Sequence, residues 1–160
     1  MAKLCNVEIK DLKTNEINGN TYYTGEIYYL GKKLGFWRQT DEDDFFNFNI
    51  SLLNEAMELY KEKYFKRIIS KYATPSMLMA ELVNLINVEN IYKTLRQRGF
   101  ITLVEIADKN WTYYHFTEHT SGQELEQFID NSVNNFMMNN SSKVKPEINI
   151  YRSLNDFNLN

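Results

Sequence analysis

Four consecutive acidic residues, Asp41, Glu42, Asp43 and Asp44, are the densest cluster of possible metal ligands in this sequence. In charge they resemble a calcium loop, but such a loop also needs a glycine at its turn and a distant bidentate glutamate. Both are missing at the required spacing, so we expect a solvated acidic turn. A binding role stays open, because four carboxylates could engage an Arg- and Lys-rich surface of another protein.

The other groups that could support metal or nucleophilic chemistry are two histidines and one cysteine. His115 and His119 are four residues apart, but the pattern predicts a strand around His115 and a loop around His119, so they are not expected to share a helical face as a zinc pair would. Cys5 lies in a strand pattern without a cue to a histidine partner, and we expect a small buried hydrophobe. The sequence predicts no metal site, no cofactor and no catalytic nucleophile.

An enzyme without a recognisable motif stays an alternative. Its acid and base groups would be Glu26, Glu105 and His115, which could converge on the sheet. Spacing alone does not show that they do.

Two adjacent lysines, Lys32 and Lys33, lie between Gly31 and Gly35. They do not match the spacing of a phosphate-binding loop, and no helix is predicted behind them. A looser site is an alternative function: the lysines would hold phosphate and neighbouring tyrosines would hold a base, which would make the chain a small-ligand binder or a sponge for a nucleotide signal.

Tyrosines occur as adjacent pairs around these lysines, at residues 22–23 and 28–29, and again at 113–114. Neighbours in a strand point to opposite faces, so each pair puts one ring toward covering helices and one away. The outward set, with Trp37 or Phe36 depending on register, would form an exposed aromatic patch typical of protein interfaces. The predicted partner-binding residues are Tyr22, Tyr28, Lys32, Lys33, Trp37, Asp41, Glu42, Asp43 and Asp44. The alternative is that the C-terminal helix covers the second face and all six rings are structural.

Residues 21–40 organise the expected fold as a hairpin joined at Gly31-Lys32-Lys33. A strand pattern at 5–9 leads into it through a turn at 13–20, and a short fourth strand is expected at 46–50. Apolar spacing then predicts a helix over 52–72 capped by Ser51, a second helix opening at Thr74-Pro75, and a third piece beyond Asn87 that stops at Gly99.

The second half of the chain begins with the apolar run 100–106, which predicts a central strand covered on both faces. Residues 111–117 are its expected hairpin partner. Ser121-Gly122-Gln123-Glu124 matches a capping box that opens a C-terminal helix, and 148–151 is a last edge strand. These segregated runs predict an α+β fold: an N-terminal antiparallel meander, a central helical layer, a second hairpin, and a C-terminal helix and edge strand.

Composition limits the partner classes. The chain of 160 residues has 18 basic and 21 acidic side chains and a formal net charge of -3, so direct nucleic-acid binding is not expected. We expect a single domain over residues 1–160. With no apolar run of about 20 residues, no recognisable signal and one cysteine, we expect no membrane contact and a cytoplasmic location.

The hairpin carries the pattern G-x-I-Y-x-x-G-K-K-x-G at residues 25–35, and Gly99 ends the helical region directly before the apolar strand at Phe100. Over residues 21–106 the chain resembles small uncharacterised accessory proteins carried by phages and conjugative elements of low-GC bacteria. The class includes proteins that block host defence by binding, such as anti-CRISPR proteins, and it transfers no catalytic residues. The resemblance implies a non-enzymatic inhibitor that binds a host protein, such as a defence nuclease, by protein-protein contact.

Overall fold

The computed structural model describes residues 1–41, 44–64, 73–108, 111–140 and 145–159. The fold is α+β, with an N-terminal strand meander, central helices, and a C-terminal helix and strand, as predicted. The backbone forms two compact units, one of residues 1–87 with the chain end from 158, and one of residues 88–157. We describe each unit by itself, and the single domain over residues 1–160 stays a prediction.

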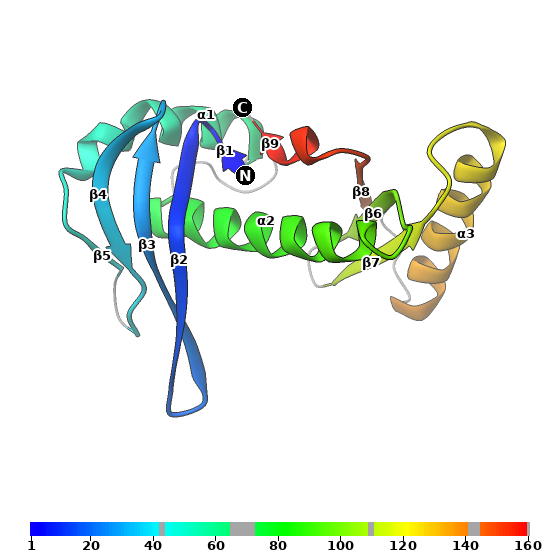
Figure 1. Ribbon diagram of the computed structural model, residues 1–160, viewed down its shortest axis with the longest axis horizontal. Helices are drawn as coiled ribbons and strands as arrows, with labels where there is room; N and C mark the ends of the chain where they lie inside the picture. The colour runs from blue at the N-terminus through cyan, green and yellow to red at the C-terminus, as the bar shows by residue number, and fades with distance from the viewer. Residues whose placement is uncertain (42–43, 65–72, 109–110, 141–144, 160) are drawn as a thin grey trace. The chain divides into compact units, whose positions relative to one another are not determined.

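The first unit is built on a six-stranded sheet in the order β5-β4-β3-β2-β1-β9 (Figure 1). Its strands are β1 (Lys3–Leu4), β2 (Val7–Ile17), β3 (Asn20–Tyr29), β4 (Lys32–Arg38), β5 (Phe45–Phe46) and β9 (Asn158–Leu159). Neighbouring strands are antiparallel except β1 and β9, which pair in parallel. The short strand β9, close to the C-terminal end of the sequence, was not predicted from the sequence.

Two-residue turns join the long strands. Asn18 and Gly19 between β2 and β3, and Leu30 and Gly31 between β3 and β4, all have positive φ. Two such residues in succession form the turn whose twist matches a β-hairpin, and Asn-Gly is its preferred sequence. The hairpin over residues 21–40 is therefore confirmed, but the long turn predicted at 13–20 is wrong, because β2 continues to Ile17 and only Asn18-Gly19 turns.

The region after the hairpin also differs from the expectation. The fourth strand ends at Phe46 instead of extending over 46–50, and a 3-10 turn follows at Ile50–Leu53. Asn49, not Ser51, is the cap: its Oδ1 accepts from the backbone N–H of Ser51 at 3.0 Å and from the Ser51 hydroxyl at 2.8 Å. A side-chain acceptor at Asn49 competes with strand pairing and starts the turn early.

Helix α1 spans Asn54–Tyr64 and α2 spans Pro75–Arg96. The predicted helix over 52–72 extends into residues 65–72, which lie outside the described residues. Thr74 caps α2 as predicted, its Oγ1 accepting from Met77 N–H at 3.2 Å. The break predicted at Asn87 is wrong, because buried residues continue on both sides of it and one asparagine costs a helix only a few tenths of a kcal/mol.

Helices cover one face of the six-stranded sheet. The Tyr29 hydroxyl of β3 donates to Glu55 of α1 at 2.9 Å, and Trp37 of β4 and Val83 of α2 line one hollow. Figure 1 shows β2 and β3 crossing in front of α2, so the helices lie behind the strands. The core between them consists mainly of Val7, Ile9, Ile27, Trp37, Ala56, Met57, Leu78, Met79, Leu82 and Val83.

The second unit contains a three-stranded sheet, β7-β6-β8, of Thr112–Thr117, Thr102–Ala107 and Glu147–Tyr151. Helix α3 (Gly122–Asn140) packs Phe136 against Val104 and Ile106 of β6. On the other face Tyr151 stacks on Phe157 at 4.4 Å, and Phe157 contacts Tyr92 of α2. The central strand buried on both faces is confirmed. No helix in the described part of the chain is both long and apolar enough to cross a membrane.

Gly25 provides a test of the sheet packing. A Cβ added there would overlap Ile9 Cγ2 and stand 3.2 Å from the Lys10 carbonyl oxygen. Because the backbone oxygen cannot yield as a side chain can, we expect Gly25→Ala to lower the free energy of unfolding by about 1–3 kcal/mol, measured by chemical denaturation. Thr21→Ala, at an exposed position on the same strand, is the control. Equal stability of the two variants would contradict this packing.

Candidate binding surface

Strand β3 presents different residues to its two sides. Ile27 is buried and Tyr29 contacts α1, so residues 23, 25, 27 and 29 face the helices. Residues 22, 24, 26 and 28 therefore face the opposite way. We call this second side of the six-stranded sheet the open face. For the pairs Tyr22-Tyr23 and Tyr28-Tyr29, one ring points toward the helices and one away, as the sequence predicts.

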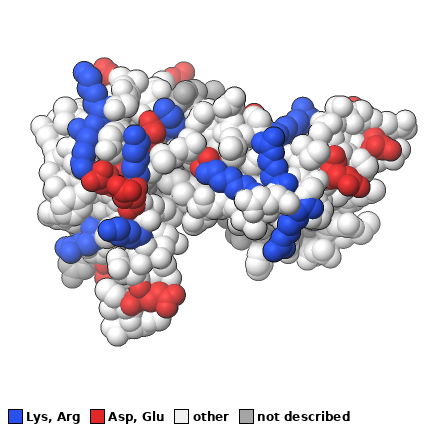
Figure 2. Space-filling model, viewed as in Figure 1, with Lys and Arg blue, Asp and Glu red and all other residues white. Residues whose placement is uncertain are grey.

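A charged cluster forms the centre of the open face. The ammonium of Lys10 lies 4.0 Å from the centroid of the Tyr28 ring, and the Tyr28 hydroxyl donates to Glu26 Oε2 at 3.1 Å. Glu26 Oε1 accepts from Lys33 Nζ in an ion pair. Figure 2 shows acidic atoms over this sheet with basic atoms on both sides of them. These contacts hold the side chains in place relative to one another.

The titration of these groups follows from their contacts. The hydrogen bond from the Lys33 ammonium holds the pKa of Glu26 below its usual range, and the same contact raises the pKa of Lys33. Desolvation, followed by the hydrogen bond to Glu26, raises the pKa of Tyr28. The carboxylate and the ammonium thus stay charged, and the phenol stays neutral, across the physiological pH range.

Aromatic rings form the margin of the open face. Phe36 and Phe45 are 40% and 46% exposed with ring centroids 5.7 Å apart, and the Arg38 guanidinium lies 5.7 Å from the Phe45 centroid. The register sets Phe36 opposite Glu26, on the open face, and Trp37 opposite Gly25. Of the two alternatives left by the sequence, the outward ring is Phe36. Trp37, which we predicted to bind a partner, is only 1% exposed.

Two shallow hollows indent the open face and meet at Thr24. One, of about 330 Å³, is lined by Tyr22, Arg38 and Asp41, among others, and the other, of about 510 Å³, lies between Phe36, Glu26 and the bulge at residues 11–13. The bulge arises because Asp11 has a positive φ and the pairing of β2 with β3 shifts between Lys10 and Lys13. The open face can therefore receive protruding side chains.

The acidic run separates into parts with different roles. Asp41 is exposed and accepts from the Tyr22 hydroxyl, a contact that raises the pKa of Tyr22. Asp44 instead accepts from the indole N–H of buried Trp37 at 2.7 Å, so this carboxylate supports the fold. Glu42 and Asp43 lie outside the described residues. Lys32 is exposed, opposite Tyr29 in the hairpin.

Sequence reasoning missed three members of this surface, Lys10, Arg38 and Phe45. Lys10 stands in the alternating pattern of the first strand, but its contact with Tyr28 depends on cross-strand register, which the sequence alone did not supply. Phe45 lies one residue before the strand predicted at 46–50, although it is the first residue of β5.

The acid-base alternative can be examined within the second unit. Glu105 is opposite Tyr114 and His115 is opposite Val104, so the two side chains lie on opposite faces of that sheet. Glu105 accepts from Tyr151 at 2.8 Å and from Asn149 at 3.3 Å, while the His115 ring packs on Phe128. They do not form an acid-base pair. Within the described ranges, no three His, Cys, Asp or Glu side chains gather closely enough to hold a metal ion.

Comparison of this chain with known protein families, with curated proteins and with solved structures gives no match.

The Asp44 contact yields a test of stability. Asp44→Ala leaves the buried indole N–H of Trp37 without its acceptor, so we expect the free energy of unfolding to fall by about 1–3 kcal/mol. Asp44→Asn keeps an oxygen acceptor for the indole N–H and should lose less stability than Asp44→Ala. Asp41→Ala, at an exposed carboxylate, is the control for the loss of charge. Equal losses for Asp41→Ala and Asp44→Ala in urea denaturation would show that the indole contact contributes nothing.

His115 yields a test of pH dependence. Burial lowers its pKa from the ordinary value of 6.5, because the charged ring is poorly solvated beside Phe128. The unfolded chain then takes up this proton at a higher pH than the folded chain does. The contribution of the neutral His115 ring to the stability of the folded state is therefore fully present above pH 6.5 and declines as the pH falls below that value. We expect an NMR titration midpoint for His115 below 6.5, with His119→Gln used for assignment. A midpoint at or above that value would refute the burial.

Proposed function

We propose that this protein is a non-enzymatic binding protein that docks onto another protein through the open face. The observation that carries the proposal is the one-sided cover of the six-stranded sheet. It leaves the rings of Phe36 and Phe45 and the charged groups around Glu26 in contact with water. Exposed apolar rings surrounded by polar groups are typical of interaction sites.

The composition of the open face suits a protein partner. Aromatic rings and arginine are enriched in interfaces because they remove large areas from water at small cost in side-chain entropy. Arg38 and Phe45 already contact each other, and Lys10 is already placed over Tyr28. A preorganised surface of this kind loses little conformational entropy on docking. The mixed charges would select a partner with complementary groups.

The same contacts favour a protein over a phosphate-bearing ligand. The alternative nucleotide site needs Lys33 to hold a phosphate, but its ammonium is paired with Glu26. A phosphate would have to displace that carboxylate and would meet its negative charge. Asp41 beside Tyr22 adds a second carboxylate to the same surface. Both groups would repel a polyanion.

We further propose that the partner is a host defence nuclease, which the protein would inhibit by covering its surface. This finer part rests on the sequence resemblance of residues 21–106 to accessory proteins of phages and conjugative elements.

The test is a pair of substitutions on the open face. Phe36→Ser and Tyr28→Ser should each weaken binding about 10-fold or more, since each removes a ring worth roughly 1–2 kcal/mol at an interface centre. The partner is recovered from a host lysate with the wild-type protein, and the dissociation constants are measured by calorimetry with the purified pair.

The matched control is Trp111→Ser, which removes a ring that is 55% exposed in the second unit. It should leave the dissociation constant unchanged. All three variants should melt within a few degrees of the wild type, because surface substitutions usually change stability by about 0.5 kcal/mol or less. Wild-type affinity in both open-face variants, or failure of the wild type to retain any protein partner, would refute the proposal.

A further inference from the structure

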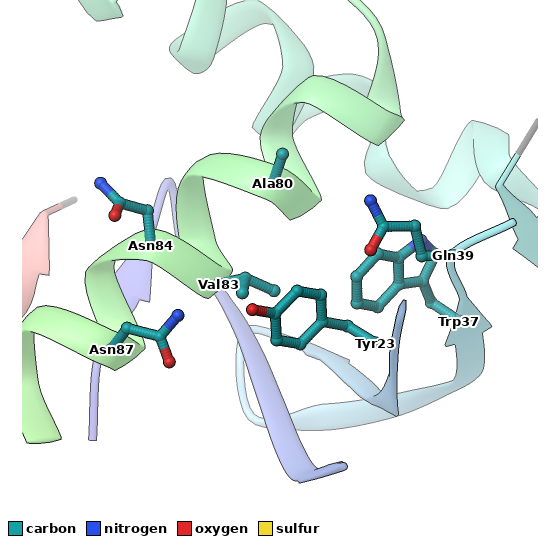
Figure 3. Close-up of a pocket in the computed structure, with 7 residues that line it drawn as sticks. All are labelled: Tyr23, Trp37, Gln39, Ala80, Val83, Asn84 and Asn87. Atoms are coloured by element: carbon teal, nitrogen blue, oxygen red, sulfur yellow. The ribbon is translucent and has the colours of Figure 1, made fainter. Parts of the chain in front are cut away.

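A hollow and a strand edge remain outside the proposed interface. The hollow, of about 240 Å³, lies between β3 and α2 and is lined by Tyr23, Val83 and Asn87, among others (Figure 3). Its Trp37 ring is only 1% exposed, and its other lining side chains are apolar or neutral and polar, so they do not select one class of ligand. The strand edge is the outer edge of β7 in the second unit, and its chemistry does select a partner.

Strand β7 is an outer strand of the three-stranded sheet. It pairs with β6 along its whole length, and no strand in the described ranges pairs with its other side. Helix α3 contacts one face of β7, where the rings of Phe136 and Tyr113 are 5.3 Å apart, yet Tyr113 is still 38% exposed. A strand edge without a neighbour presents backbone donors and acceptors on which a further strand can pair.

The hydrogen bonds at the two ends of β7 show which residues point outward. The carbonyl of Trp111 accepts a bond of 2.9 Å from the residue just after β6, and the carbonyl of Thr117 accepts one of 3.0 Å from the residue just before β6. Both carbonyls therefore point to the β6 side, and in an antiparallel ladder this direction alternates along the strand. Thr112 and Phe116 consequently direct their N–H and C=O groups away from β6, to the outer edge.

The other strand edges carry features that block such pairing. Strands β5 and β9 have two residues each, and β8 begins with the charged Glu147 directly after Pro146. Strand β2, which pairs with β1 only at Val7, has a bulge and charged residues such as Lys13. Short strands, charges, proline and bulges keep exposed edges from pairing with other chains. Strand β7 has six residues without proline, glycine, lysine, arginine, aspartate or glutamate, and its register with β6 does not shift.

A second copy of β7 fits this edge. Two copies related by a two-fold axis pair antiparallel, and the register that joins their outward backbone groups sets Thr112 opposite Phe116 of the other copy. On the α3 face, the same register sets Tyr113 opposite His115 of the other copy. Burial lowers the pKa of His115 from its ordinary value of 6.5, so no like charges meet between the two strands at neutral pH. Aromatic cross-strand pairs stabilise a sheet.

We propose that the protein forms a two-fold dimer in which the β7 strands of two copies pair antiparallel and join their sheets into one continuous sheet. Thr112 and Phe116 supply backbone hydrogen bonds at the ends of the paired segment, and the symmetry repeats these bonds. Strand β7 belongs to the second unit and the open face to the first, so the dimer does not depend on the proposed protein partner.

Sedimentation equilibrium of the full chain tests the dimer directly. With rising concentration, the mass of the wild type should approach twice the monomer mass of 19.0 kDa. Thr112→Pro removes an outward N–H at the first residue of β7, an exposed position where a strand tolerates proline. It should weaken dimerisation about 10-fold or more, because both copies lose a hydrogen bond.

Thr112→Val is the matched control, because it changes the same side chain and keeps the backbone N–H. It should dimerise like the wild type. Circular dichroism should show the same secondary structure in the wild type and both variants.

A disulfide tests the register. Opposite residues of a hydrogen-bonded pair have Cα atoms about 5.5 Å apart, which a disulfide can span. The double variant Thr112→Cys/Phe116→Cys should therefore form a covalent dimer on mild oxidation. Thr112→Cys alone is the control, because its two copies would stand roughly 14 Å apart, four residues along the paired strands. The natural Cys5 is buried in both variants.

A monomer mass over the whole accessible concentration range would overturn the proposal. A dimer that is as tight in Thr112→Pro as in Thr112→Val would also overturn it, since the outward N–H would then take no part. Equal cross-linking of the single and the double cysteine variants would overturn it as well, because the strands would not pair in this register.

Discussion

The middle strand β3 pairs with β2 on one side along its length, and with β4 on the other side from Thr24 to Tyr29, so its side chains must divide between two environments. The row that includes Ile27 is buried against helices, and the row that includes Glu26 and Tyr28 meets water. Because the period of a strand is two, a slip of one residue would exchange the rows. The turns at Asn18-Gly19 and Leu30-Gly31 prevent that slip by fixing the register.

Trp37 shows how the two rows are coupled. Its ring is buried opposite Gly25, where the absence of a side chain leaves space for Ile9, and its N–H is satisfied by Asp44. Turning this ring inward turns Phe36 outward. One strand thus supplies a core residue on the helix-covered side and the margin of the open face, and both are consequences of a single register.

Much of the fold could be predicted from the sequence because its signals are local. Thr74-Pro75, Gly31, Gly99 and the apolar run at 100–106 each mark an element that the structure contains. The predictions were wrong where a nonlocal contact or a competing cap determines where an element begins or ends. Examples are Asn49, Asn87 and the pairing of β9 with β1. The candidate surface was predicted in part: alternation identified Tyr28, but the inward turn of Trp37 and the role of Lys10 depend on cross-strand register.

The central claim is that the open face is accessible in the free protein and covered in the complex. Hydroxyl-radical footprinting compares Phe36 with Trp37, its neighbour in sequence, in both states. The account predicts strong labelling of Phe36 in the free protein, protection of Phe36 in the complex, and weak labelling of Trp37 in both. Weak labelling of Phe36 in the free protein, or equal labelling of Phe36 with and without the partner, would contradict it.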